Sequence, residues 1–175
     1  LKITGPFTIE VWVYPIDVGV NSDQPHTILG SYPAAWSTTK GHFVLQWVPD
    51  TQKAKLLINY PLTYGGDTTA ICWANCGKNA WSHIAATRYD YGTLRLFVNG
   101  VEGYSNEATD RLHPIGFLAQ ELLLLGGSIG YDFIGYLQEA QLSRYCKWVE
   151  DFTVPVVSFS EGEEIPYEVH HEGNK

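Results

Sequence analysis

Two glutamates near opposite ends of the chain are the side chains best suited to acid–base chemistry. Glu10 lies within Thr-Ile-Glu-Val-Trp-Val (residues 8–13), and Glu139 lies within Gly-Tyr-Leu-Gln-Glu-Ala-Gln-Leu-Ser (residues 135–143). A retaining glycosidase needs two carboxyl groups about 5 to 5.5 Å apart, as nucleophile and as acid/base. The same-face neighbours of Glu10 on a strand are Thr8 and Trp12, and neither can serve. Glu139 could be a partner only if the first and last strands pair, and its orientation stays open because the alternation around it is broken. We therefore expect no enzymatic activity.

Aromatic residues in turn-rich segments indicate a different chemistry. The C–H faces of sugars stack on Trp and Tyr rings, and sugar hydroxyls bind Asp, Asn and Gln. We expect a glycan platform in loops at the rim, formed by Tyr32, Trp36, Trp73, Tyr131 and Asp132. The alternative, that these residues cap the ends of the fold or contact a neighbouring subunit, stays open.

Other chemically capable residues are better explained by packing. His83 shares a strand face with Trp81 and Ala85, which predicts a packed histidine rather than a base, with ring nitrogens bonded to backbone or hydroxyl groups. Trp12, Trp47 and Trp81 lie within predicted strands, and we expect them in the core or on a sheet face, because an indole buries a large area.

Alternation with a period of two dominates the chain and predicts β-strands. In residues 7–14 the odd positions are apolar and should face the core. Further strands are predicted at 27–31, 42–48, 54–60, 81–89, 93–99, 122–129 and 135–143. Asn99-Gly100 suits a type I′ turn, in which both central residues have positive φ. Many short strands with short turns predict an all-β fold, an antiparallel two-sheet jelly-roll sandwich.

Composition limits the size and the partners of the molecule. The chain has 175 residues, of which 45% are hydrophobic, and this suits one domain. A formal net charge of −8 argues against binding to nucleic acid or anionic lipid. The longest apolar runs are too short to span a bilayer. We assign residues 1–155 to the domain and 156–175 to an acidic extended tail or linker. Without methionine or a signal peptide, the chain is expected to be a piece of something longer.

Three cysteines, Cys72, Cys76 and Cys146, permit at most one intramolecular disulfide. Cys72 and Cys76 could close a small loop, or all three could be thiols. No nearby cysteine pair or histidine completes a zinc site. Calcium could bind carboxylates from Asp23, Asp67 and Asp132, although no local cluster concentrates these acids.

Three segments together resemble laminin-G-like domains of the concanavalin A-like lectin/glucanase superfamily. They are FTIEVWVYP near the start, WSHIAATRYDYGTLRLFVNGVEGY in the middle, and FIGYLQEAQLSRYCKWVEDFTVP toward the end. The likeness covers residues 4–155, and the last segment is similar to versions found in bacteriophage and bacterial surface proteins.

The resemblance implies a curved two-sheet jelly roll whose rim loops bind glycans or proteins, often with calcium. It also implies an extracellular, cell-surface or virion-surface location. The chain departs from the family pattern at Gln138, where an acid is usual, so a role tied to that acid is in doubt.

These observations favour a non-enzymatic glycan- or protein-binding adhesion module of a larger surface or virion protein, of the phage fibre or capsid-decorating type. Neighbouring subunits of an assembly are expected partners. The alternatives are a purely structural subunit of a virion or filament, and a polysaccharide-degrading enzyme that uses Glu10 and an acid on an adjacent strand.

Overall fold

The computed structural model describes residues 2–3, 6–16, 24–32, 42–59, 69–89, 93–104, 106–107, 115–116, 122–127 and 132–154. All the regular secondary structure in these ranges is β-strand. No helix in them is long and apolar enough to span a membrane. The predicted tail, residues 156–175, lies outside the described residues.

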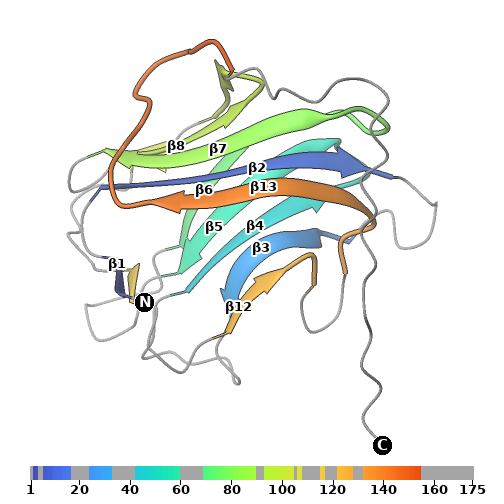
Figure 1. The fold of residues 1–175 in the computed structure, drawn as a ribbon, viewed down its shortest axis with the longest axis horizontal. Coiled ribbons are helices and arrows are strands. Elements are labelled where there is room, and N and C mark those ends of the chain that lie inside the picture. Colours follow the sequence, from blue (N-terminus) through green and yellow to red (C-terminus); the bar gives the residue numbers. More distant parts are fainter. Residues whose placement is uncertain are drawn as a thin grey trace, which may run out of the picture.

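Two antiparallel sheets form the layers of a jelly-roll sandwich, as predicted (Figure 1). The six-stranded sheet has the order β10-β8-β7-β2-β13, and β9 also pairs with β8. Its strands are β2 (Phe7–Pro15), β7 (Ser82–Tyr89), β8 (Thr93–Val98), β9 (Val101–Glu102), β10 (Asn106–Glu107) and β13 (Gly135–Ser143).

The five-stranded sheet lies behind it in the order β12-β3-β4-β5-β6. Its strands are β3 (His26–Tyr32), β4 (His42–Val48), β5 (Lys53–Asn59), β6 (Thr69–Asn75) and β12 (Leu122–Leu125). A small separate pair is formed by β1 (Lys2–Ile3) and β11 (Ile115–Gly116).

One hydrophobic core fills the space between the two sheets. Phe7, Ile9, Val11 and Val13 of β2 are at most 2% exposed, which confirms the predicted core face. The inner residues of β4, β5 and β6 meet them from the other sheet, and Trp47 is completely buried there. Its indole nitrogen donates a hydrogen bond to the Cys76 carbonyl, as a buried indole usually does.

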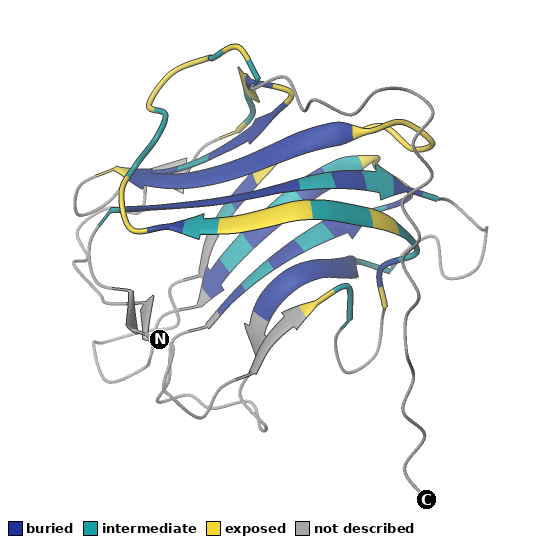
Figure 2. Ribbon diagram, viewed as in Figure 1, coloured by how far each residue is buried: buried dark blue, intermediate teal, exposed yellow. Residues whose placement is uncertain are grey.

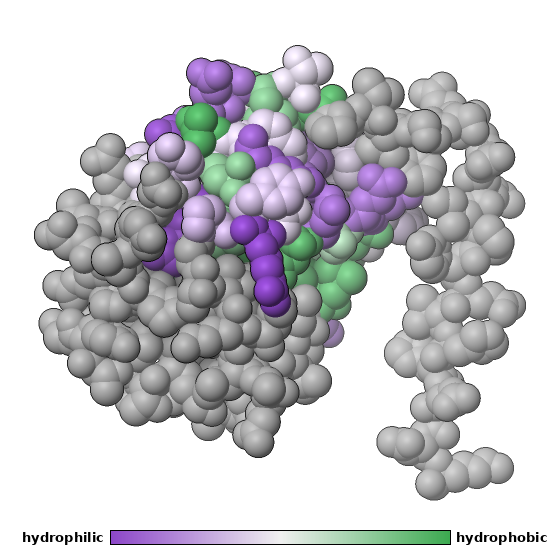
Figure 3. Space-filling model, turned by 60° about the vertical axis from the view of Figure 1, so that its left-hand side comes forward, coloured by the Kyte–Doolittle hydropathy of each residue, from purple (hydrophilic) through white to green (hydrophobic). Residues whose placement is uncertain are grey.

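On the surface, the described residues that are coloured in Figure 3 include both hydrophilic and hydrophobic ones, which is the ordinary pattern for a face in contact with water.

The predicted strands and turn are largely confirmed. β4 and β13 begin and end where alternation predicts, and Asn99 and Gly100 have φ angles of 52° and 79°, as a type I′ turn requires. β6 is a strand that the sequence pattern does not predict, because Trp73 and its neighbours lie next to turn signals that indicate a loop. Its extended form places Cys72 and Cys76 roughly 13 Å apart at about 3.3 Å per residue, too far for the disulfide considered above.

Residues 144–154, hereafter the strap, leave β13 and cross the outer face of the six-stranded sheet (Figure 1). The Thr8 hydroxyl donates to the Tyr145 carbonyl, and the Thr87 hydroxyl donates to the Trp148 carbonyl. Farther along, the Phe152 amide donates to the Gly100 carbonyl. Because the strap covers this end of the sheet, β2 and β7 are buried on both faces there, whereas the middle of β13 is exposed (Figure 2).

Candidate functional site

The outer face of the six-stranded sheet carries aromatic and polar side chains in rows across three strands. β2 pairs with β13 on one side and β7 on the other, so Trp12 lies between Gln138 and His83. One step toward the strap, Glu10 lies opposite Gln141. Pairing of the first and last long strands, the condition set above for Glu139 to approach Glu10, is therefore met.

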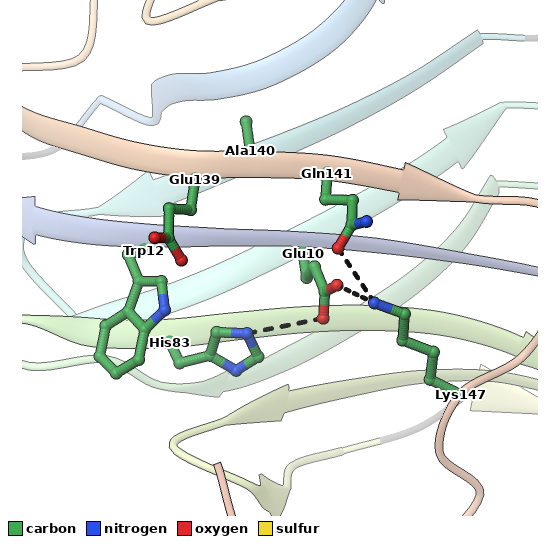
Figure 4. A pocket seen from close by; sticks show the side chains of 7 residues that line it. All are labelled: Glu10, Trp12, His83, Glu139, Ala140, Gln141 and Lys147. Atoms are coloured by element: carbon green, nitrogen blue, oxygen red, sulfur yellow. Dashed lines mark hydrogen bonds and ion pairs between the residues drawn. The ribbon is translucent and has the colours of Figure 1, made fainter. Parts of the chain in front are cut away.

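A pocket of about 550 Å³ opens on this face beside the strap. We call it the β2 pocket; it is lined by Glu10, Trp12, His83, Glu139, Ala140, Gln141 and Lys147 (Figure 4). Four separate elements supply these residues: β2, β7, β13 and the strap. The side chains of Glu10 and Glu139 lie on the same side of the sheet, with Trp12 close to Glu139 (Figure 4).

Glu10 is held by a network of polar groups at the base of the pocket. Its side chain is 9% exposed and forms an ion pair with Lys147, whose ammonium also donates to the Gln141 amide oxygen over 3.1 Å. His83 Nε2 lies 3.7 Å from Glu10 Oε2, which is long for a hydrogen bond but close enough for electrostatic attraction if the ring is protonated. The lysine thus joins the strap to the sheet.

Burial alone would raise the pKa of the Glu10 carboxyl, but His83 and Lys147 together outweigh it. The pKa is consequently lower than its usual value of 4.5. Glu10 is ionised at neutral pH and is poorly suited to donate a proton as a general acid.

The lowered pKa of Glu10 predicts an acid-dependent contribution to stability. This contribution is present above pH 4.5, the usual pKa, and is lost as the pH falls through the lower pKa of the folded state. We expect Glu10→Gln to remove it, so that the free energies of unfolding of wild type and variant converge at acidic pH. Denaturant unfolding across this pH range measures the effect, and a difference that stayed constant with pH would contradict it.

His83 is packed, as predicted, but its surroundings differ from those expected. Its ring lies 5.2 Å from that of Trp12 and makes edge contacts with Trp148 and Phe152 of the strap. Nδ1 is buried without a hydrogen-bond partner in the described part of the chain. The expected bonds from the ring to backbone or hydroxyl groups are therefore not found there.

An aromatic row, formed by Tyr136, Tyr14 and Trp81, borders the pocket on the side away from the strap. Tyr14 contacts Tyr136 and Trp81 at ring-centroid distances of 5.8 and 5.7 Å. Tyr136 is 61% and Trp81 44% exposed, so Trp81 belongs to the sheet face and not to the core. Tyr14 and Trp12 are alternate residues of β2, which places the row roughly 7 Å from the indole in the pocket.

The residues predicted to form a rim platform are not brought together among the described residues. Trp36 and Tyr131 lie outside that set, and Tyr32 is the last residue of β3, where its backbone pairs with Leu122. Asp132 is exposed, and its backbone forms an isolated parallel β-bridge with that of Thr27.

Trp73 lies within β6, so the prediction that it occupies a loop is wrong. Its ring stacks on Tyr104 at 5.5 Å, and the Lys53 ammonium lies 3.8 Å from its centroid. Two groups of the chain thus already contact this indole, on a different sheet from the β2 pocket. A binding role for Trp73 stays a prediction.

Metal ligands are not clustered in the part of the chain that the structure describes. No group of three His, Cys, Asp or Glu side chains there could hold an ion. Asp23 and Asp67, two of the three acids considered for calcium, lie outside the described residues. The thiols of Cys72 and Cys146 donate hydrogen bonds to the carbonyls of Leu94 and Trp148, and burial raises the pKa of Cys76 to about 11.

Sequence reasoning considered Glu10, Glu139 and His83 for catalysis, but it did not predict that this face forms a binding site. The available signal was the even face of residues 8–14, where Glu10, Trp12 and Tyr14 follow one another. No comparable sequence pattern marks Tyr136, Gln141 and Lys147. These residues reach the outer face of the six-stranded sheet only because β13 pairs with β2 and the strap crosses the sheet.

Comparison with known proteins places the chain in a structural context. A family model described as the concanavalin A-like lectin/glucanases superfamily matches residues 1–149. No curated protein sequence matches the chain.

Several solved structures share the fold at low sequence identity. The Ruminococcus gnavus IT-sialidase CBM40 bound to α2,3-sialyllactose has a TM-score of 0.61 and 16% identity, with 82% of this chain and 78% of that one covered. A heptameric SAP-like pentraxin from Limulus polyphemus has a TM-score of 0.53 and 14% identity, over 83% and 67% of the two chains. The botulinum neurotoxin serotype D binding domain has a TM-score of 0.62 and 13% identity, over 83% of this chain and 34% of that one. At these identities the likeness shows the fold.

Proposed function

Because the chain belongs to the concanavalin A-like lectin/glucanase superfamily, we propose that it is a non-catalytic module that binds a glycan on the outer face of its six-stranded sheet. The observation that carries the proposal is the exposed aromatic row beside a pocket of polar side chains. Exposed rings offer apolar faces for sugar C–H groups, and carboxylate, amide and ammonium groups meet the hydroxyls. A few directed polar groups beside apolar surface are typical of small-molecule sites.

Similar structures support a binding role. One is a carbohydrate-binding module with sialyllactose bound, and another is the binding domain of a neurotoxin. We extend the proposal to an extracellular, cell-surface or virion-surface setting, with the module as part of a larger surface protein such as a phage fibre or a capsid-decorating protein.

The state of Glu10 supports binding without hydrolysis. A glycosidase acid needs a raised pKa and access to the glycosidic oxygen, and a glycosidase nucleophile needs a carboxylate free to reach the anomeric carbon. The Glu10 carboxylate is instead paired with Lys147 at the base of the pocket, and its pKa is lowered. We therefore assign Glu10 to holding the strap. Release of reducing ends from a bound glycan would overturn this part of the proposal.

A glycan array probed with the purified chain tests the binding function. We expect binding to a defined set of glycans, and Tyr136→Ala or Trp81→Ala should weaken it about 10-fold, since losing one stacked ring removes roughly 1.4 kcal/mol. Both side chains are largely exposed, so the truncations leave the core intact.

Trp73→Ala is a matched control, because it removes an exposed tryptophan from the other sheet. We expect this variant to bind as wild type does. Loss of binding in Trp73→Ala with full binding in Tyr136→Ala would indicate that the glycan binds at Trp73, as the sequence predicts, and not on the outer face of the six-stranded sheet. Absence of binding to every glycan would refute the proposed function.

A further inference from the structure

The charges in the β2 pocket do not cancel, and this imbalance bears on which sugars it could hold. Lys147, the cation among the lining residues, is already engaged by Glu10 and Gln141. Glu139 is exposed, and no residue in the described part of the chain forms an ion pair with it. The carboxylate of Glu139 is thus the available charge in the pocket, in a chain whose formal net charge is −8.

A β-bulge directs Glu139 toward the pocket. The register between β13 and β2 breaks between Gln138 and Gln141, and Glu139 has a φ of 50°. A glutamate in this left-handed region costs about 1 kcal/mol, and bulges are found where a side chain must be re-aimed. Strict alternation from Tyr136 and Gln138 would point residue 139 into the core. With the bulge, its carboxylate lies on the pocket side of the sheet, next to Trp12 (Figure 4).

An unpaired carboxylate beside aromatic rings is the combination that recognises an ammonium group. The carboxylate supplies a charge-assisted hydrogen bond, and the face of an indole or phenol attracts a cation within about 6 Å. A sugar that carries a carboxylate would instead meet the like charge of Glu139, which is a means of rejecting wrong ligands.

We propose that the β2 pocket selects for positive charge and takes a saccharide unit with a protonated amine, of the glucosamine type, in preference to its N-acetylated form. It rejects saccharides that carry a carboxylate. This inference rests on the proposed function and specifies its ligand class, and it assigns Glu139 the role of the residue that determines specificity.

Titration calorimetry with the full chain, slightly below neutral pH and in physiological salt, tests the selection. The probes are a glucosamine tetramer, an N-acetylglucosamine tetramer and sialyllactose. We expect the glucosamine tetramer to bind about 10-fold more tightly than its acetylated counterpart, the ratio for one charge-assisted contact, and sialyllactose not to bind detectably.

Glu139→Gln keeps the shape of the side chain and removes its charge. We expect it to weaken binding of the glucosamine tetramer about 10-fold while binding of the acetylated tetramer is retained. Asp50→Asn, in the turn between β4 and β5 of the other sheet, removes the same charge from an exposed position and should leave both affinities unchanged.

The outcomes separate the inference from the function on which it rests. Equal affinity for the two tetramers, tighter binding of sialyllactose, or a preference that survives Glu139→Gln would overturn the charge selection. If the array still showed glycan binding that depends on Tyr136, the proposed function would stand. Absence of binding to all glycans would overturn both.

Discussion

Gly100→Ala is expected to lower the free energy of unfolding by about 3 kcal/mol or more, because the new methyl group has no space. Gly100 has a φ of 79°, and a Cβ atom built on it would lie 1.9 Å from the carbonyl oxygen of Phe152. This oxygen belongs to the backbone, so the strap itself must move. The Phe152 amide also donates to the Gly100 carbonyl, and this hydrogen bond would be displaced with it.

Denaturant unfolding measures the loss, with Gly77→Ala as the control. Gly77 is exposed, and a Cβ atom there meets nothing within 4 Å, so the control should remain within about 0.5 kcal/mol of wild type. A Gly100→Ala variant as stable as the control would show that the strap does not pack on the hairpin between β8 and β9.

Lys147→Met is expected to lower the free energy of unfolding by about 2 kcal/mol. Removing one partner of a buried ion pair leaves the other charge uncompensated, at a cost of roughly 3 to 5 kcal/mol. Here the lysine side chain is 19% exposed and the glutamate 9%, so water reduces that cost. The variant should also weaken glycan binding, because Lys147 holds the strap against the pocket and orders Gln141.

A double-mutant cycle of Lys147→Met with Glu10→Gln separates two contributions to the loss of stability. One is the loss of the Glu10–Lys147 ion pair, and the other is the loss of packing by the lysine side chain. In the double variant position 10 carries no carboxylate that lacks its ammonium partner, and we expect part of the stability to return. Lys55→Met, on the other sheet, controls for the loss of one positive charge. Additive effects of the two substitutions would contradict a direct coupling between strap and sheet.

The fold was predictable because its signals are local. Alternation in Phe7 to Tyr14 identifies which side faces the core, and burial of at most 2% at its odd positions confirms this. Positive φ at Asn99 and Gly100 follows from the residue types that tolerate it. β6 is not predicted by the sequence, because the residues around Trp73 lie next to turn signals that indicate a loop, whereas pairing with β5 over its whole length forms the strand.

The candidate site was far less predictable, and Glu10 illustrates why. Its sequence neighbours Thr8 and Trp12 could be judged from the period of a strand, and they excluded a catalytic pair on β2 itself. His83 and Lys147 lower its pKa, and Lys147 is 137 positions away in the chain. Glu139 faces the same pocket because a bulge breaks the alternation of β13, and a local pattern does not specify on which side of a bulge a side chain emerges.

The sequence by itself determined the two-sheet sandwich, the inward face of residues 7–14 and the turn at Asn99-Gly100. These depend on side-chain period and on backbone preferences of a few neighbouring residues. Only the tertiary structure decided which side chains line the β2 pocket. The lining of the β2 pocket comes from β2, from its two neighbouring strands β13 and β7, and from the strap that crosses the sheet. These contacts depend on strand register and on the path of the strap. Both are established by residues far apart in the sequence, and only when the chain is folded.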